Sequence, residues 1–374
     1  MRHAQITGWG MHVPSTVITN DAFVKMGLDT TDEWITSRTG ITQRRLVARD
    51  EATSDLAVKA ARNALQVADV HAADIDLVIV ATCTPDHVMP STASIVQDRL
   101  GAHSAGAFDV NAACAGFAYA LNIGASHIES GRAKQVLVVG ADELSIYLDW
   151  KDRGTCILFG DGAGAVILAG GPEPGILSST MGSDGSGAPL LTIPGGGSRI
   201  RANGKNGAHP AANYLRMNGP RIFRWATEMM TEAAEKVMAE SHLKPDQVDL
   251  FIPHQANMRI IEATARKLGF PMKKVFSNVQ RYGNTSAASI PIALCEAAEA
   301  GALRVGDNVV LTSFGAGLSW AAVAMRWTQE IAAARGPWKP LRHQVEAQVA
   351  AARSAIRRRE RRIRATIEER LGRE

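Results

Sequence analysis

The sequence is poor in aromatic residues, which make up 5% of its 374 residues, and it has only 4 cysteines. Few aromatic faces disfavour a stacking platform for single strands, so we expect no nucleic-acid partner for the body of the chain. The cysteines are widely spaced and form no C-x-x-C pair: Cys83, Cys114, Cys156 and Cys295. This spacing disfavours a structural zinc site or a disulfide framework, and we expect no bound metal.

Long apolar runs are also absent, and no run reaches the roughly 18 residues that a membrane span needs. Residues 1–5 continue directly into a strand-like pattern without the apolar segment of a secretory signal. Together with the cysteine pattern, these absences predict a cytoplasmic protein without a membrane span.

Excess charge of one sign is lacking in the body and is confined to the C-terminal segment. Residues 331–374 hold 12 Lys/Arg and 5 Asp/Glu, against 29 and 32 in the remainder. The segment follows a Gly-Pro-rich break at 336–340, and its apolar residues recur at spacings of 4 or 7: Val345, Val349, Ile356, Ile363, Ile367 and Leu371. We interpret residues 329–374 as a basic amphipathic helical extension that docks on the body or on a subunit partner. A coiled-coil contact, or attraction to an acidic surface including nucleic acid, stays open.

The body alternates short apolar runs with helical stretches. Residues 77–81 and 136–140 predict strands buried on both faces, and residues 56–67 and 118–130 predict helices that cover them. Such alternation is typical of an α/β architecture.

The chain also repeats itself at an offset of 173 residues. Residues 76–79 match 249–252, and residues 135–138 match 308–311 in the same order. Two matches at one offset favour a duplicated α/β unit over coincidence and direct attention to a site between the halves. We place the halves at residues 1–173 and 174–328, and interpret the Gly-rich loop at 194–213 as a lid or an interface flap.

Three residues have the context of a reactive site. Cys114 stands where a strand-like run passes into a small-residue helix, and the positive end of that helix is expected to favour its thiolate form. His254 follows an apolar strand, at the edge where α/β sheets bind ligands. Asn284 precedes another small-residue helix and is the 173-residue counterpart of Asn111. A buried inert cysteine, a structural histidine and a helix-capping asparagine are the alternative interpretations.

The motifs around these residues resemble the β-ketoacyl-acyl-carrier-protein synthase III family of the thiolase superfamily. The resemblance runs from about residue 3 to Trp327 and includes the segments 112–117, 159–165, 253–257, 283–286 and 314–320. It implies a five-layered αβαβα sandwich of two duplicated halves, usually a homodimer, with acyl-CoA and malonyl-acyl-carrier protein as substrates and no cofactor.

The resemblance also implies roles for the reactive residues in a decarboxylative Claisen condensation that initiates fatty-acid synthesis. Cys114 takes an acyl group from acyl-CoA as a thioester. His254 and Asn284 stabilise the enolate oxygen formed when the malonyl group loses CO₂. The backbone N–H groups of Cys114 and Ala316 match the oxyanion hole.

Further residues match ligand contacts of the family. Trp34 and Arg153 match the residues on either side of the CoA adenine, and Arg38 matches a phosphate contact. Gly219 and Asn257 match positions along the pantetheine tunnel. The basic residues of one expected helix match a docking face for the carrier protein: Arg259, Arg266 and Lys267.

Met89 stands where some relatives have an aromatic residue that closes the partner subunit's acyl pocket. A flexible Met is expected to admit primers longer than acetyl. Two other functions stay open: an acyltransferase or condensing enzyme of a secondary-metabolite (polyketide-type) pathway, and a non-catalytic scaffold that recruits partners through its basic tail.

Overall fold

The computed structural model describes residues 2–199 and 210–330, together with individual positions between 345 and 363. Half of the predicted lid or flap at 194–213 and most of the predicted extension at 329–374, including Ile367 and Leu371, therefore lie outside the described residues.

The first large sheet is built mainly from the apolar runs of residues 1–173. Its strand order is β1-β7-β6-β4-β5, with β4, β5 and β6 parallel to one another and β7 antiparallel to both of its neighbours, β6 and β1. The bounds are β1 His3–His12, β4 Leu77–Ala81, β5 Gly106–Val110, β6 Gln135–Asp142 and β7 Gly162–Gly171. Every residue of β4 is buried because helices cover both faces of the sheet.

The second large sheet has the order β11-β12-β13-β8, with only β11 and β12 parallel. Its bounds are β8 Ile176–Ser183, β11 Leu250–Pro253, β12 Asn308–Gly315 and β13 Ser319–Arg326. Two small ribbons flank the body: β2 Thr16–Thr19 with β3 Gln43–Leu46, and β9 Leu191–Thr192 with β10 Arg216–Met217.

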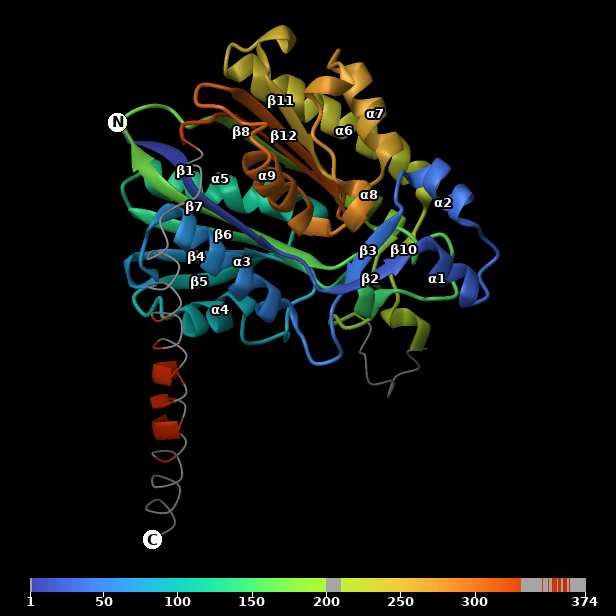
Figure 1. Cartoon of the computed structure of the whole chain (residues 1–374), viewed down its shortest axis with the longest axis horizontal. Coiled ribbons are helices and arrows are strands. Elements are labelled where there is room, and N and C mark those ends of the chain that lie inside the picture. The colour runs from blue at the N-terminus through green and yellow to red at the C-terminus, as the bar shows by residue number, and fades with distance from the viewer. Residues whose placement is uncertain are drawn as a thin grey trace.

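The longer helices complete five layers around the two sheets (Figure 1). Outer helices α3 (Thr53–Ala68) and α4 (Thr92–Leu100) pack on the first sheet, and α6 (Gly219–Glu240) and α7 (Met258–Lys267) pack on the second. Helices α5 (Gly116–Glu129) and α9 (Ser289–Glu299) lie between the sheets. Short helices join these layers: α1 Asn20–Lys25, α2 Asp32–Thr39 and α8 Val279–Tyr282. The predicted αβαβα sandwich is confirmed.

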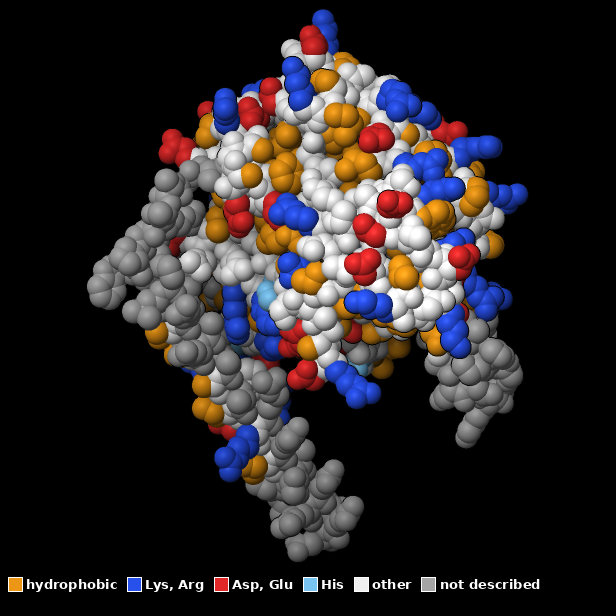
Figure 2. Space-filling model, turned by 45° about the vertical axis from the view of Figure 1, so that its right-hand side comes forward, with side chains coloured by type: hydrophobic (Ala, Val, Ile, Leu, Met, Phe, Trp, Pro, Cys, Tyr) orange, Lys and Arg blue, Asp and Glu red, His pale blue; other side chains and the backbone are white. Residues whose placement is uncertain are grey.

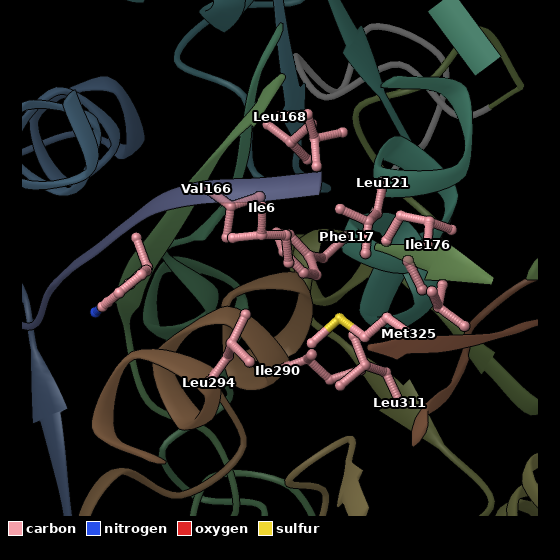
Figure 3. Close-up of a cluster of buried hydrophobic side chains, with 14 of the residues drawn as sticks. Ile6, Phe117, Leu121, Val166, Leu168, Ile176, Ile290, Leu294, Leu311 and Met325 are labelled. Carbon is pink, nitrogen blue, oxygen red and sulfur yellow. The ribbon is translucent and has the colours of Figure 1, made fainter. Parts of the chain in front are cut away.

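The central layer forms a continuous apolar core (Figure 3). Phe117 and Leu121 of α5 meet Ile290 and Leu294 of α9, between side chains from both sheets. At roughly 25 cal/mol per Å² of buried apolar area, this layer fixes the two helices, and therefore the residues at their N-termini, against one another.

The structure confirms the duplication and extends it. At the 173-residue offset, β1 begins at His3 and β8 at Ile176, while α5 begins at Gly116 and α9 at Ser289. The residue three positions before each helix has a left-handed backbone although neither is glycine: Ala113 has φ +46° and Ser286 has φ +50°. The turns before α5 and α9, the two helices of the central layer, therefore share the same unusual left-handed backbone conformation.

The described positions of the extension are helical and lead away from the body past α4 (Figure 1). Their apolar side chains are exposed, with 51% of Val345, 42% of Val349, 57% of Ile356 and 51% of Ile363 accessible. Ser354 donates to Asp98, and Arg357 contacts His103, so this helix touches the end of α4. Within the described residues, no helix is both long and apolar enough to cross a membrane.

Candidate active site

A cavity of about 600 Å³ opens between the two halves of the molecule. Its lining includes predicted residues from both halves: Trp34, Arg38, Cys114, Arg153, Gly219, His254, Asn257, Arg259 and Asn284. The structure thus brings the predicted thiol, imidazole and carboxamide to one space, although they lie up to 170 residues apart in the sequence.

Cys114 lies in a short turn, Ala113–Ala115, between β5 and α5. Small residues are required here because the end of β12 packs against the turn. A Cβ on Gly315 would lie 2.7 Å from the Cys114 backbone nitrogen. Cys114 is 8% exposed, so its sulfur is reached through the cavity.

The expectation that the helix favours a thiolate is wrong for this state of the site. Burial, the largest effect, raises the pKa of Cys114 to about 12, and the nearby Asp142 carboxylate raises it further. Hydrogen bonds from Ser286 and Asn284 oppose this rise. Removing the thiolate from water disfavours its charge, an effect opposite in sign to that of the helix N-terminus. The free protein therefore holds Cys114 as a neutral thiol.

We expect the alkylation of Cys114 by iodoacetamide to accelerate about tenfold per pH unit from pH 7 to 9. The thiolate is the reactive form, and its fraction grows tenfold per unit as long as the pH stays below the pKa. Mass spectrometry of the intact protein measures the rate. Free cysteine, with a pKa of about 8.5, is the reference compound, and its alkylation rate begins to level off within this pH range. A plateau for Cys114 near pH 7 would restore the thiolate interpretation.

His254 follows β11, and its imidazole is 2% exposed. Its backbone N–H donates to Thr312 of β12, and its Nδ1 lies 2.6 Å from the Ser289 hydroxyl at the start of α9. Burial lowers the pKa of His254 to about 3, because the interior disfavours the charged ring. The ring is therefore neutral and donates from only one nitrogen.

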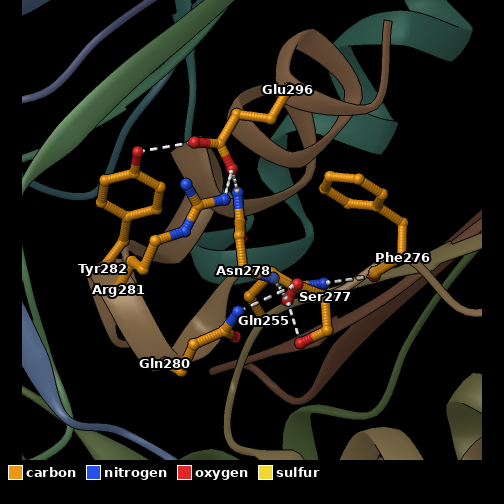
Figure 4. Close-up of polar contacts among 8 residues, drawn as sticks. All are labelled: Gln255, Phe276, Ser277, Asn278, Gln280, Arg281, Tyr282 and Glu296. Atoms are coloured by element: carbon orange, nitrogen blue, oxygen red, sulfur yellow. Dashed lines mark hydrogen bonds and ion pairs between the residues drawn. The ribbon is translucent and has the colours of Figure 1, made fainter. Parts of the chain in front are cut away.

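The next residue, Gln255, anchors this part of the chain (Figure 4). Its side-chain nitrogen donates to Pro253 and Phe276 carbonyls, and its oxygen accepts from Ser277 and Asn278. All of its polar groups are satisfied while it is 1% exposed, so the His254 backbone is held rigidly.

Glu296 of α9 ties the same region to α8. It accepts from Asn278, Arg281 and Tyr282 over 2.6 to 2.7 Å (Figure 4). Since α8 ends at Tyr282, two residues before Asn284, this network fixes the position of the backbone that leads to Asn284.

Asn284 is held by both halves. Its backbone N–H donates to the Leu158 carbonyl, and its own carbonyl accepts from the Gly160 N–H, so the start of the motif at 159–165 pairs with the chain at Asn284. Its side-chain oxygen accepts from the Ser286 N–H at 2.8 Å. The amide nitrogen is consequently turned toward the cavity and the Cys114 sulfur, whose charged form it favours.

Asp142, at the end of β6, is a buried clamp that sequence reasoning missed. One oxygen accepts from Thr82, Cys83 and Thr84 of the first half, and the other accepts from the Ala287 N–H of the second. The carboxylate thus holds the turn after Asn284 against the end of β4. Its position at the carboxyl end of a central strand was the available signal.

Cys83 lies beside this clamp and was also overlooked as a neighbour of the nucleophile. Its sulfur is 3.8 Å from the Ser286 hydroxyl, and burial together with the charges of Asp142 and Cys114 raises its pKa. The raised pKa keeps Cys83 protonated, and it does not belong to the cavity lining.

The residues predicted to bind CoA gather at one end of the cavity. The Arg153 guanidinium carbon lies 4.4 Å, and that of Arg38 5.3 Å, from the centre of the Trp34 ring. Arg153 also bonds to Asp29. The guanidinium therefore stacks on the indole directly, and a base inserted between them requires Arg153 to move.

The other predicted ligand residues occupy helix starts. Gly219 is the first residue of α6, and Asn257 caps α7 by accepting from the Ile260 N–H at 3.0 Å. Arg259, Arg266 and Lys267 are exposed on α7, but only Arg259 belongs to the cavity lining. Figure 2 shows several Lys and Arg side chains toward the right-hand side of the molecule in that view.

Besides Arg266 and Lys267, two further predicted residues, Ala316 and Met89, lie outside the lining. Ala316 follows Gly315 in the loop beside the nucleophile, where the Ser319 hydroxyl contacts the carbonyls of Ala112 and Ala316 at 2.9 Å. Met89 is 86% exposed and Val88 is 95% exposed, so their loop tip points to solvent in the single chain.

Apolar residues line much of the remaining cavity and were not identified from the sequence: Ile157, Leu158, Phe159, Leu191, Met217, Ile222, Phe223 and Phe314. No local motif marks them, because strands, helices and loops from both halves contribute. Among the residues that the structure describes, no three His, Cys, Asp or Glu side chains are grouped to hold a metal ion.

Comparison with known proteins now assigns the family. Residues 108–185 match the model of 3-oxoacyl-[acyl-carrier-protein] synthase III, and residues 238–327 match the model of its C-terminal part. A β-ketoacyl-[acyl-carrier-protein] synthase III of Clostridium perfringens is 48% identical over 87% of this chain and 100% of its own length. The chain belongs to the 3-oxoacyl-acyl-carrier-protein synthase III family.

Solved structures of synthase III proteins have the same fold. The enzyme from Aquifex aeolicus aligns with a TM-score of 0.80 at 46% identity, covering 87% of this chain and 100% of its own. The priming β-ketosynthase of the R1128 polyketide pathway aligns with a TM-score of 0.82 at 36% identity, covering 88% and 97%. The match to the family model of the C-terminal part ends at residue 327, before the predicted extension at 329–374.

Proposed function

We propose that this protein condenses an acyl-CoA primer with malonyl-acyl-carrier protein to give 3-oxoacyl-acyl-carrier protein, CoA and CO₂, the initiating step of fatty-acid synthesis. The observation that carries the proposal is the cavity shared by Cys114, His254 and Asn284. The identity of 48% to a β-ketoacyl-acyl-carrier-protein synthase III supports this function over the polyketide-type alternative.

In the first half-reaction, the Cys114 sulfur attacks the thioester carbonyl of acyl-CoA. The bond between that carbonyl and the CoA sulfur breaks, and CoA leaves with the proton that Cys114 loses. The backbone N–H groups of Cys114 and Ala316 stabilise the tetrahedral oxyanion. The small residues around the turn let the substrate approach this closely.

In the second half-reaction, the malonyl group loses CO₂, and negative charge develops on its thioester oxygen. His254 and Asn284 donate hydrogen bonds to that oxygen, and the enolate carbon attacks the acyl-Cys114 carbonyl. The cysteine leaves as a thiolate and takes up one proton. A neutral imidazole is suited to this role, since its pKa of about 3 keeps it a constant donor through the neutral range.

The decisive experiment combines two measurements on the purified protein. Mass spectrometry after mixing with acyl-CoAs of increasing chain length detects the adduct on Cys114, and labelled malonyl-acyl-carrier protein reports CO₂ release. Both signals are expected. Acyl transfer without CO₂ would indicate an acyltransferase, and no adduct at all would indicate a scaffold.

We further propose a cytoplasmic homodimer that forms along β5. This strand is an edge of its sheet, with β4 as its one partner among the described strands, and the exposed Val88–Met89 tip lies in the loop between β4 and α4. Exposed apolar tips and open edges are features that partner subunits cover. The four cysteines are free, as expected in a reducing compartment.

Within such a dimer, Met89 closes the partner's primer pocket. Met89→Phe is expected to shift acylation of Cys114 at least about fivefold toward acetyl-CoA, because a rigid ring replaces an adaptable side chain. An acyl-CoA series with mass spectrometry measures the shift, and sedimentation measures the dimer. Met272→Phe is the control, since Met272 is exposed but lies outside the cavity lining. An unchanged chain-length profile would remove Met89 from the pocket.

A further inference from the structure

The hydroxyl of Ser289 stands directly behind the imidazole of His254. Both side chains are almost sealed from solvent, at 1% and 2% exposure, and Ser289 Oγ lies 2.6 Å from His254 Nδ1. Ser289 is the first residue of α9, whose position is fixed by the central apolar layer. The contact is therefore built into the fold.

The surrounding hydrogen bonds favour one direction for this contact, with the hydroxyl as donor. The Gln255 N–H donates to Ser289 Oγ at 3.4 Å, which uses a lone pair of that oxygen. The one proton of the hydroxyl is then free to donate to His254 Nδ1, the acceptor within reach. When the hydroxyl donates to Nδ1, the single proton of the neutral ring resides on the other nitrogen, Nε2.

His254 Nε2 is the nitrogen that reaches the cavity. It has no hydrogen-bond partner among the described residues, and it is not among their buried side-chain atoms left without one. Since His254 lines the cavity, Nε2–H is open to a ligand. It is the group that a donor to an oxyanion requires.

The duplication shows that the serine accompanies the histidine. At the 173-residue offset, Ala81 occupies the position of His254, and Gly116 occupies the position of Ser289. A Cβ built on Gly116 would lie 3.1 Å from the Ala81 Cβ, so the two positions also face each other in the first half. The first half, which has Ala81 in place of the histidine, thus has Gly116 and no hydroxyl in place of the serine.

We propose that Ser289 is a positioning residue that holds His254 in the Nε2–H tautomer, and so makes it a hydrogen-bond donor to the enolate rather than a base for Cys114. This inference rests on the proposed condensation. The opposite tautomer, with Nδ1–H donating to Ser289, would leave Nε2 as an acceptor suited to the Cys114 proton.

The tautomer itself is measured without any reaction. Solid-state NMR of the full-length protein labelled with [δ1-¹⁵N]histidine reports whether each Nδ1 carries a proton, and the spectrum of His254→Ala identifies the His254 signal. The expected signal is that of an unprotonated nitrogen. A protonated Nδ1 in the wild-type protein overturns the proposal, whatever the protein catalyses.

The kinetic test uses Ser289→Ala. Condensation is expected to fall about 10- to 100-fold in kcat, because the freed ring populates both tautomers and turns away from its donor geometry. Acylation of Cys114 should stay within about twofold, and KM for the malonyl-carrier protein within about threefold. Ser289→Thr, which keeps a hydroxyl, should restore most of the condensation rate.

Ser178→Ala is the matched control, because it removes a hydrogen-bonded hydroxyl outside the cavity lining, one that donates to the Val237 carbonyl at 2.8 Å. An equal fall of acylation and condensation in Ser289→Ala would show a merely structural role. If the wild-type protein releases no CO₂, the proposed function fails, whereas the NMR result still decides the tautomer.

Discussion

Replacing Cys114 with alanine is expected to abolish the acyl adduct and to lower condensation by at least about 10⁴-fold. The sulfur forms the covalent intermediate, and no neighbouring group can take its place. Cys83 is an alternative thiol nearby, but it lies outside the cavity lining and is therefore not expected to meet the substrate. Intact-protein mass spectrometry with acyl-CoA and a coupled condensation assay measure the two losses.

The same variant separates the half-reactions. His254 and Asn284 remain in place, so Cys114→Ala should still release CO₂ from malonyl-acyl-carrier protein without forming a 3-oxoacyl product. Cys295→Ala is the control, since Cys295 is a fully buried thiol in α9 that lies outside the cavity lining. An adduct of unchanged yield in Cys114→Ala would assign the nucleophile to another residue.

The architecture was predictable because its strands are buried on both faces. The apolar run at 77–81 is β4, with the same bounds, and the helix expected at 56–67 is the interior of α3. The helix expected at 118–130 begins two residues earlier, at Gly116. Glycine obscured that start, since local propensity disfavours it in a helix, whereas close packing against Ala81 requires it.

The grouping of Cys114, His254 and Asn284 in one cavity was predictable because each follows a recognisable chain signal: a strand end, a small-residue helix start or a repeat counterpart. The protonation state of Cys114 was not, because it depends on how deeply β12 and the turn at Ser286–Ala288 bury the thiol. Asp142 and Ser289 were missed for a related reason. Their hydrogen bonds join the two halves or two layers, and no local spacing encodes them.

Replacing His254 with alanine is expected to lower condensation by about 10²–10³-fold while acylation of Cys114 stays within about threefold. The imidazole donates to charge that appears only when the malonyl group loses CO₂, so its removal slows that step alone. The buried neutral ring is not needed to accept the thiol proton if its Nε2 already carries one. Single-turnover acylation and steady-state CO₂ release measure the two steps separately.

Asn284→Ala should resemble His254→Ala, and the double variant should lose much less than the product of the single effects, because both groups serve one oxygen. His127→Ala is the control, as His127 lies on α5 outside the cavity lining and its imidazole contacts the Ile123 carbonyl at 2.9 Å. A comparable loss of acylation in His254→Ala would make the imidazole the base for Cys114. In the proposed mechanism, the first half supplies the nucleophile and the second half stabilises the enolate. That separation of roles would then be wrong, because one side chain of the second half would act in both steps.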